Sequence, residues 1–208
     1  MSAALNMAIS PRLKLGFLAS RNGTSFRAIL KAIEDGELAA DALIVVSNNR
    51  KAGALIHAAE HGVPTHHIPT QADPVRADAE LTQLMAEAGV ELIVLSGYLR
   101  RLGPVTLSHY RGGILNVHPS LLPAFGGEGM YGRRVHEAVI AAGVRESGAT
   151  IHLVDEVYDH GAVVRQRSLP VHLGETVDQL EARVAALEPE LFVETIKQIA
   201  AGSLVLAG

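Results

Sequence analysis

Residues 92–117, LIVLSGYLRRLGPVTLSHYRGGILNV, hold the pattern that decides the fold. A short apolar run, Leu92–Ser96, precedes a segment that begins with proline at Pro104, and a second apolar run follows over Gly113–Val117. Proline is common at the first position of a helix, because the N–H that it lacks would have no partner there. Two apolar strands joined through a helix predict a parallel β-α-β unit with both faces of the strands buried.

The same alternation extends towards the N-terminus. Apolar runs that read as strands take turns with segments of helical period, and most helices end at glycine, which favours the left-handed conformation of a helix end. The predicted strands are Leu13–Ala19, Ala42–Ser47 and His66–Ile68, and the predicted helices are Ser25–Asp35, Gly53–His61, Pro74–Ala88 and Pro104–Tyr110.

The pattern changes after Arg133. A helix over Arg133–Ala142 is followed by two strands, Gly148–Val154 and Ala162–Leu169, which read as an antiparallel hairpin-like pair. A last helix is predicted over about 175–201, with a kink or break at Pro189, because proline lacks the N–H that a helix interior uses.

These elements predict one α/β domain with a Rossmann-like, mostly parallel twisted sheet and helices on both faces, extended by the C-terminal antiparallel pair and the long helix. We expect this domain to cover residues 12–208, after a short lead-in over 1–11. Parallel sheets bind ligands beyond the carboxyl ends of their strands, so we expect the site at the loops that follow those ends.

Composition excludes several classes of function. The net charge is −4 and no basic run is present, which disfavours nucleic acid as a partner. No apolar run approaches the roughly 20 residues of a membrane span, and the first residues lack the basic start of a signal peptide. The chain contains no cysteine. A cytoplasmic protein fits these features.

Asn116 and His118 are the first candidate functional residues. They end an apolar strand and lie two residues apart, so their side chains point the same way. Pro119 and Pro123 stiffen the loop that follows. An amide donor beside an imidazole suits the handling of a carbonyl group, although a single histidine near a strand is more often structural.

Three further motifs leave alternatives open. The loop Ser20–Ser25 opens a helix and could hold an anion on backbone N–H groups, or be an ordinary turn in which Thr24 or Ser25 caps the helix. The acidic loop Asp155–Gly161 could orient His118 or be a solvated turn. The glycine-rich segment Phe125–Gly132 could cover a site or be a surface turn. The ten histidines show no HExxH motif, so no metal is expected.

Together these motifs resemble the folate-dependent formyltransferase family, and within it the members that act on glycinamide ribonucleotide. The resemblance covers nearly the whole chain. Asn116–Pro123 matches the family motif N-[IV]-H-P-S-L-L-P, and Asp159 matches the catalytic aspartate of a D-x-x-x-D-x-G pattern. Ser20–Ser25 matches S-x-N-G-[ST]-[NS]. The segment Phe125–Gly132 departs from the usual family pattern, because it is longer and richer in glycine.

The resemblance implies transfer of the formyl group of 10-formyltetrahydrofolate to the amine of glycinamide ribonucleotide in purine synthesis. It implies direct attack by the amine, without a metal. Asn116 would hydrogen-bond the formyl oxygen. His118 would stabilise the developing charge as an imidazolium, or pass a proton through water. Asp159 would orient His118 and assist proton transfer from the amine.

The resemblance also assigns residues to each substrate. For the nucleotide, it gives the phosphate and ribose to Asn22, Gly23, Thr24, Ser25 and Glu188. For the folate, it gives Arg76, Leu99, Arg100, Arg101, Leu102, Val154, Asp155 and Glu156, with His152 as a further histidine behind the site.

Relatives with the same motifs provide the alternatives. A formyltetrahydrofolate hydrolase would carry an extra N-terminal domain, and a formyltransferase acting on transfer RNA a C-terminal RNA-binding domain, so 208 residues favour the ribonucleotide. Another N-formyltransferase stays open. A non-catalytic binding module would have lost one of Asn116, His118 and Asp159. We expect small-molecule partners only, in a monomer or homodimer.

Overall fold

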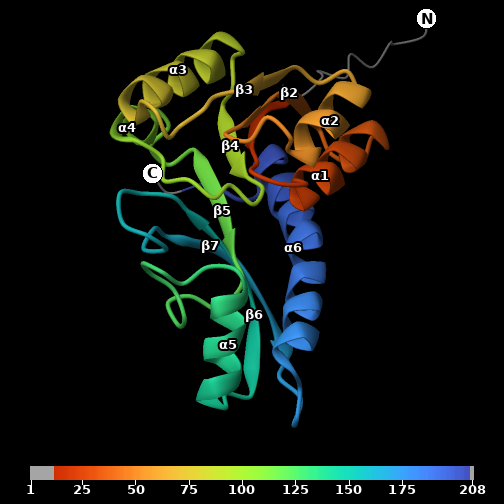
Figure 1. The fold of residues 1–208 in the computed structure, drawn as a ribbon. Coiled ribbons are helices and arrows are strands. Elements are labelled where there is room, and N and C mark those ends of the chain that lie inside the picture. Colours follow the sequence, from red (N-terminus) through yellow and green to blue (C-terminus); the bar gives the residue numbers. More distant parts are fainter. Residues whose placement is uncertain (1–11, 207–208) are drawn as a thin grey trace, which may run out of the picture.

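The computed structural model describes residues 12–206, so the expected lead-in over 1–11 lies outside the described residues. Within them the chain forms one seven-stranded sheet in the order β3-β2-β1-β4-β5-β6-β7 (Figure 1). The elements in chain order are β1 (Leu13–Leu18), α1 (Thr24–Glu34), β2 (Ala40–Ser47), α2 (Gly53–Glu60), β3 (Thr65–His67), α3 (Pro74–Glu87), β4 (Leu92–Leu95), α4 (Pro104–His109), β5 (Ile114–His118), α5 (Arg133–Ala142), β6 (Glu146–Leu153), β7 (Val163–Pro170) and α6 (Val177–Ala200).

The sheet is parallel from β3 to β5 and antiparallel from β5 to β7. β1 pairs in parallel with β2 and β4, and β4 pairs in parallel with β5. β6 then runs antiparallel between β5 and β7, with Asn116 opposite His152 and His118 opposite Thr150. The predicted fold class, including the C-terminal antiparallel pair and the long helix, is confirmed.

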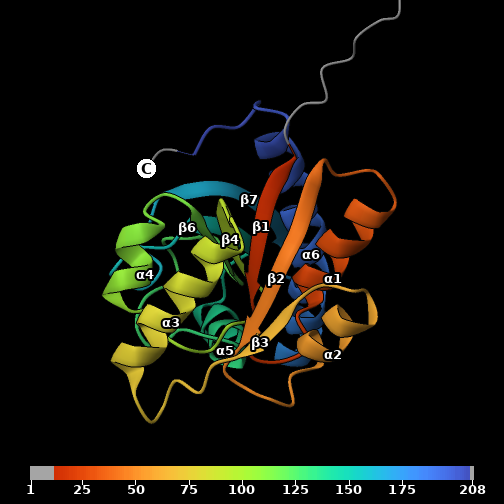
Figure 2. The same cartoon turned by 90° about the horizontal axis from the view of Figure 1, so that it is seen from above.

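Two apolar layers cover the sheet, one on each face. Phe17, Phe26 and Phe192 belong to the larger core, which joins the sheet to α1, α2, α5 and α6. Leu81 and Met85 belong to the other core, which joins it to α3 and α4. Seen from above, α3 and α4 lie on one side of the strands, and α1 and α2 on the other (Figure 2). Burial on both faces explains why the parallel strands are continuous apolar runs.

The strand order reverses between β1 and β4, which are neighbours although two strands separate them in sequence. Two hydrogen bonds join the segments that follow these strands, one from the loop after β1 and one from the first turn of α1. Ser20 N–H donates to the Gly97 carbonyl at 3.1 Å, and Phe26 N–H donates to Ser96 Oγ at 2.9 Å. A reversal of this kind opens a crevice beyond the carboxyl ends of the strands, where doubly wound sheets bind their ligands.

The structure excludes two of the local alternatives that the sequence left open. Neither Thr24 nor Ser25 caps α1: the N-cap is Gly23, in the left-handed conformation with φ 63° and no side-chain cap. Of the kink or break expected at Pro189, the break does not occur, since α6 is one helix from Val177 to Ala200 that contains this proline. Packing of α6 against α1, β6 and β7 outweighs the local effect of proline, as tertiary contacts often do.

The two edges of the sheet differ. β3 has three residues, whereas β7 has eight. Arg165 and Arg167 on β7 form ion pairs with Glu194 on α6, at 3.4 and 2.6 Å. Within residues 12–206, no helix is both long enough and apolar enough to span a bilayer.

Candidate functional site

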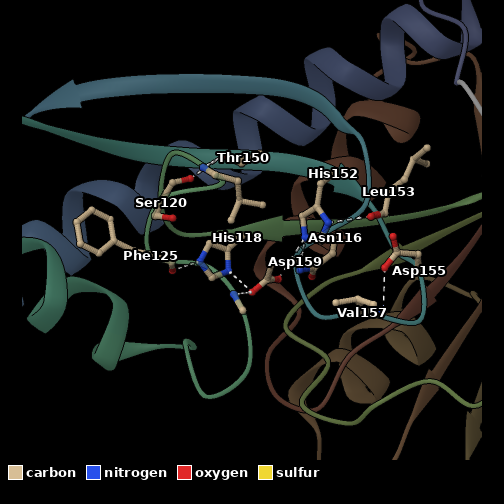
Figure 3. A network of polar contacts seen from close by, with 12 residues as sticks. Asn116, His118, Ser120, Phe125, Thr150, His152, Leu153, Asp155, Val157 and Asp159 are labelled. Atoms are coloured by element: carbon tan, nitrogen blue, oxygen red, sulfur yellow. Dashed lines mark hydrogen bonds and ion pairs between the residues drawn. The ribbon is translucent and has the colours of Figure 1, made fainter.

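The candidate site forms around the last residues of β5. Asn116 and His118 project from this strand, and Asp159 reaches them from the loop between β6 and β7 (Figure 3). The side chain of His118 is 4% exposed and that of Asp159 is 11% exposed. The structure therefore brings together the three residues that the sequence singled out, although Asp159 lies more than forty residues from His118 in the chain.

Both ring nitrogens of His118 face oxygen acceptors. Nδ1 lies 3.3 Å from Asp159 Oδ2, and Nε2 lies 2.8 Å from the Phe125 carbonyl. A neutral imidazole carries one N–H and donates to one acceptor, whereas the imidazolium donates to both. The two acceptors fix the orientation of the buried ring, whichever nitrogen carries the proton.

The start of the glycine-rich segment holds this pair in place. Phe125 has φ 56° and packs its side chain against the larger core, which turns its carbonyl toward His118. Two residues later, Gly127 N–H donates to Asp159 Oδ2 at 3.0 Å. Gly126, between them, has no room for a side chain, since a Cβ there would lie 2.4 Å from Leu122 Cδ2 and 3.3 Å from Asp159 Cβ. This part of the segment packs directly onto the site.

His152 fixes the amide of Asn116 from the neighbouring strand. Its Nδ1–H donates to the Leu153 carbonyl at 2.8 Å, so its Nε2 accepts from Asn116 Nδ2 at 3.1 Å. Burial lowers the pKa of His152, although the Leu153 carbonyl and the Asp159 carboxylate oppose this effect. A neutral His152 leaves the second N–H of the Asn116 amide available to a ligand.

A cavity of about 100 Å³ opens beside these residues, and Asn116, His152 and Asp159 line it. Most residues that the resemblance gave to the folate line it too: Arg100, Arg101, Leu102, Val154, Asp155 and Glu156. Sequence reasoning missed five further residues of its wall. The short segments in which they lie had already been singled out, but only the fold shows which side chains face inward: Leu95, Tyr98, Leu107, Val157 and Tyr158.

Arg101 joins the two sides of this cavity. Its Nη2 donates to the Glu156 carbonyl at 2.7 Å, and its guanidinium lies 5.3 Å from the centre of the Tyr158 ring, within the range of a cation–π contact. Leu99 and Arg76 are not among the residues that line the cavity. Leu99 is 53% exposed, and Arg76 is exposed at the start of α3.

A second cavity, of about 230 Å³, lies on the other side of the loop after β4. It shares Tyr98 and Arg100–Leu102 with the first cavity, and its further walls include Ile68, Asp78 and Leu81. Burial raises the pKa of Tyr98 to about 12, so the phenol between the two cavities is uncharged at neutral pH.

The loop between β1 and α1 exposes backbone donors. Phe26 N–H is used by Ser96, whereas Thr24 N–H and Ser25 N–H have no acceptor among residues 12–206. Arg27 Nε donates to the Asn22 carbonyl at 3.0 Å and holds the loop. Free N–H groups at a helix start, beside a fixed cation, suit an anion.

Glu188 lies on α6, which packs against α1. Burial raises the pKa of Glu188 to about 7. Its carboxyl has neither an ion-pair partner nor a hydrogen bond within the described part of the chain. Among these same residues, no group of three or more His, Cys, Asp or Glu side chains is arranged to hold a metal ion.

An amide donor and an imidazole beside a cavity can together stabilise charge on a carbonyl oxygen, which is what acyl transfer requires. A family model described as formyl transferase matches residues 13–196. The chain belongs to the formyl transferase family.

Named relatives agree with this family. The chain is 38% identical to the chloroplastic phosphoribosylglycinamide formyltransferase of Vigna unguiculata over 190 residues, which are 90% of this chain and 61% of that protein. It is 32% identical to the phosphoribosylglycinamide formyltransferase of Haemophilus influenzae over 195 residues, which are 93% of this chain and 90% of that protein. The chain spans about three fifths of the length of the Vigna relative.

The fold is also similar to that of a solved structure with a related name. The crystal structure of glycinamide ribonucleotide transformylase 1 from Symbiobacterium toebii has a TM-score of 0.86 to this chain at 34% identity. The match covers 95% of this chain and 92% of that one.

Proposed function

We propose that this chain transfers the formyl group of 10-formyltetrahydrofolate to the amine of glycinamide ribonucleotide, a step of purine synthesis. One observation carries the proposal: Asn116 and Asp159 line the same cavity as Arg100–Leu102 and Val154–Glu156. A folate held by these two segments would present its formyl group to the amide and to the His118–Asp159 pair.

The proposed chemistry needs no protein nucleophile. The amine nitrogen of the nucleotide attacks the formyl carbon, and negative charge develops on the formyl oxygen. The Asn116 amide donates to that oxygen, and the imidazolium of His118 stabilises it electrostatically. Asp159 accepts the proton from the attacking nitrogen. The bond from the formyl carbon to folate N10 then breaks, and N10 receives the proton that Asp159 accepted, directly or through water, which releases tetrahydrofolate and restores the Asp159 carboxylate.

The proposed nucleotide contacts lie between α1 and α6. The phosphate would accept from the free N–H groups of Thr24 and Ser25, with Asn22 and Gly23 beside it. The unpaired carboxyl of Glu188 would take the ribose hydroxyl groups as partners, which offsets the cost of its burial.

The proposal also covers the extent of the domain, the cellular compartment and the oligomeric state. It treats residues 12–208 as one formyltransferase domain, which the continuous sheet over 12–206 supports. It places the protein in the cytoplasm as a monomer or homodimer. The absence of cysteine fits a reducing compartment, although the Vigna relative is named chloroplastic.

The decisive experiment measures tetrahydrofolate release from 10-formyltetrahydrofolate with glycinamide ribonucleotide, and with water alone. Release that depends on the ribonucleotide is expected. Equal release without it would identify a formyltetrahydrofolate hydrolase instead, and release only with a different amine would identify another N-formyltransferase.

The variant Asp159→Asn tests the mechanism in the same assay. It keeps the shape of the side chain but removes the charge beside His118 and the proton acceptor, so kcat should fall by about 10²- to 10⁴-fold. Asp35→Asn, at an exposed carboxylate after α1, is the matched control and should retain activity. Unchanged transfer by Asp159→Asn would refute the mechanism.

A further inference from the structure

The segment Tyr98–Leu102 is a common wall of the two cavities. All of its residues except Leu99 line both of them, so a shift of this segment would change the shape of the proposed folate cavity. At its upstream side, Leu99 N–H donates to Ser20 Oγ at 2.8 Å. On its downstream side the segment continues through Gly103 into α4, and the first turn of α4 is hydrogen-bonded to Asp78.

Asp78, on α3, caps the start of α4. Its Oδ2 accepts from Val105 N–H at 2.8 Å, and its Oδ1 accepts from Thr106 N–H at 3.1 Å. The Thr106 hydroxyl also donates to Oδ1, at 2.5 Å. Asp78 is 7% exposed and forms no ion pair among residues 12–206. Buried donors that lose such an acceptor keep the full cost of their desolvation, so this contact fixes α4 strongly.

Gly103 shows how closely the carboxylate approaches the wall. This residue has φ −86° and ψ 171°, which any amino acid adopts without strain. A Cβ at this position would lie 2.2 Å from Asp78 Oδ2 and 2.3 Å from its Cγ. Glycine is required here because of Asp78, and not because of the backbone conformation.

We propose that Asp78 is a positioning residue for folate binding. By fixing Gly103 and the start of α4, Asp78 determines the position of the segment Tyr98–Leu102 relative to the bound folate. Asp78 lines only the second cavity, so it acts through the wall and does not touch a ligand in the first. The identity of the ligand as a folate rests on the proposed function. The β1–α1 loop is tied to the upstream side of the wall through Ser20, whereas Asp78 holds the downstream side. Nucleotide binding should therefore depend on Asp78 much less than folate binding does.

The test compares Asp78→Asn with the unaltered chain. The amide has one acceptor oxygen, and its NH₂ group would face a backbone N–H donor. We expect the Kd for tetrahydrofolate, measured by calorimetry, and the KM for 10-formyltetrahydrofolate to rise about 10-fold, with a much smaller rise in the KM for the ribonucleotide. Glu87→Gln, at an exposed carboxylate on the same helix, is the matched control.

Gly103→Ala provides a second variant that keeps the carboxylate and all its donors. Its Cβ must displace either Asp78 or the wall, so it should weaken tetrahydrofolate binding to a similar extent. The proposal is overturned if either folded variant binds tetrahydrofolate as the unaltered chain does, or if folate and ribonucleotide KM values rise equally. Calorimetry does not depend on the formyl acceptor. A chain that binds folate but transfers nothing to the ribonucleotide would therefore contradict the proposed function alone.

Discussion

Replacing Gly126 with alanine should impair formyl transfer because the added methyl group would displace the catalytic residues. Gly126 lies outside the left-handed region, so its backbone accepts alanine, but the added Cβ would lie 2.4 Å from Leu122 Cδ2 and 3.3 Å from Asp159 Cβ. The clashing atom is a terminal methyl of Leu122, whose side chain is buried and so has little free space to rotate into, while its backbone is fixed by hydrogen bonds to Thr150 and Gln166. The segment must therefore move away from Asp159.

The expected magnitude follows from that distance. Carbon atoms in contact stand about 3.5 Å apart, so relief of the clash requires a movement of about 1 Å. That movement would also strain the contacts of Gly127 with Asp159 and of Phe125 with His118. A displacement of about 1 Å at a catalytic group costs about 100-fold in rate, which corresponds to about 2.7 kcal/mol of transition-state stabilisation.

The assay is steady-state formyl transfer with both substrates varied. In Gly126→Ala, kcat should fall about 100-fold, while both KM values stay within a few-fold of the original. Gly143→Ala is the control: Gly143 has φ 62° and open space around its Cβ position, so alanine there lowers stability without moving the site. The reasoning is wrong if Gly126→Ala keeps its kcat, or if only KM values change.

Three other outcomes are expected. Gly23→Ala should raise the KM for the ribonucleotide at least about 10-fold and leave that for the folate unchanged, because its Cβ would lie 2.9 Å from Ala54 Cβ at φ 63°; equal effects would refute the anion loop. Burial raises the pKa of Glu188 from 4.5 to about 7, so the folded chain holds this proton more tightly than the unfolded chain, and stability falls as pH rises from 4.5 to 7. Thermal melts of Glu188→Gln should lack this part of the decline, and parallel pH profiles would contradict it. Pro189→Ala should raise the melting temperature by several degrees, because proline inside a helix costs up to about 3 kcal/mol; a lower value would show that α6 has adapted to the ring.

The sequence predicted most of the fold because the deciding signals are local. Apolar runs and helical periods identify strands and helices wherever packing agrees with them, as over Arg133–Ala142, where prediction and structure coincide. The errors arose where packing or backbone geometry prevailed. The left-handed Gly23 starts α1 without a side-chain cap, and α6 continues through Pro189.

The site was predictable in its side chains and not in its backbone contacts. Asn116 and His118 stand together because a strand repeats every two residues, and Asp159 entered through the family pattern. The Phe125 carbonyl and Gly127 N–H carry no signal, because any residue type supplies them and only the loop conformation aims them. Asp78 escaped notice for a different reason: a carboxylate on a helix gives no sign that its partners lie 27 and 28 residues further along the chain.

The two edges of the sheet differ in how they resist aggregation at high protein concentration. Exposed edge strands are templates for pairing with another chain, and proteins protect them by keeping them short or charged. β3 uses the first device with three residues. β7 uses the second, since Arg165 and Arg167 stand along it, tied to Glu194 on α6. Charged side chains on an edge strand oppose pairing with another chain, so replacing these two arginines with apolar residues is expected to lower solubility without altering the site.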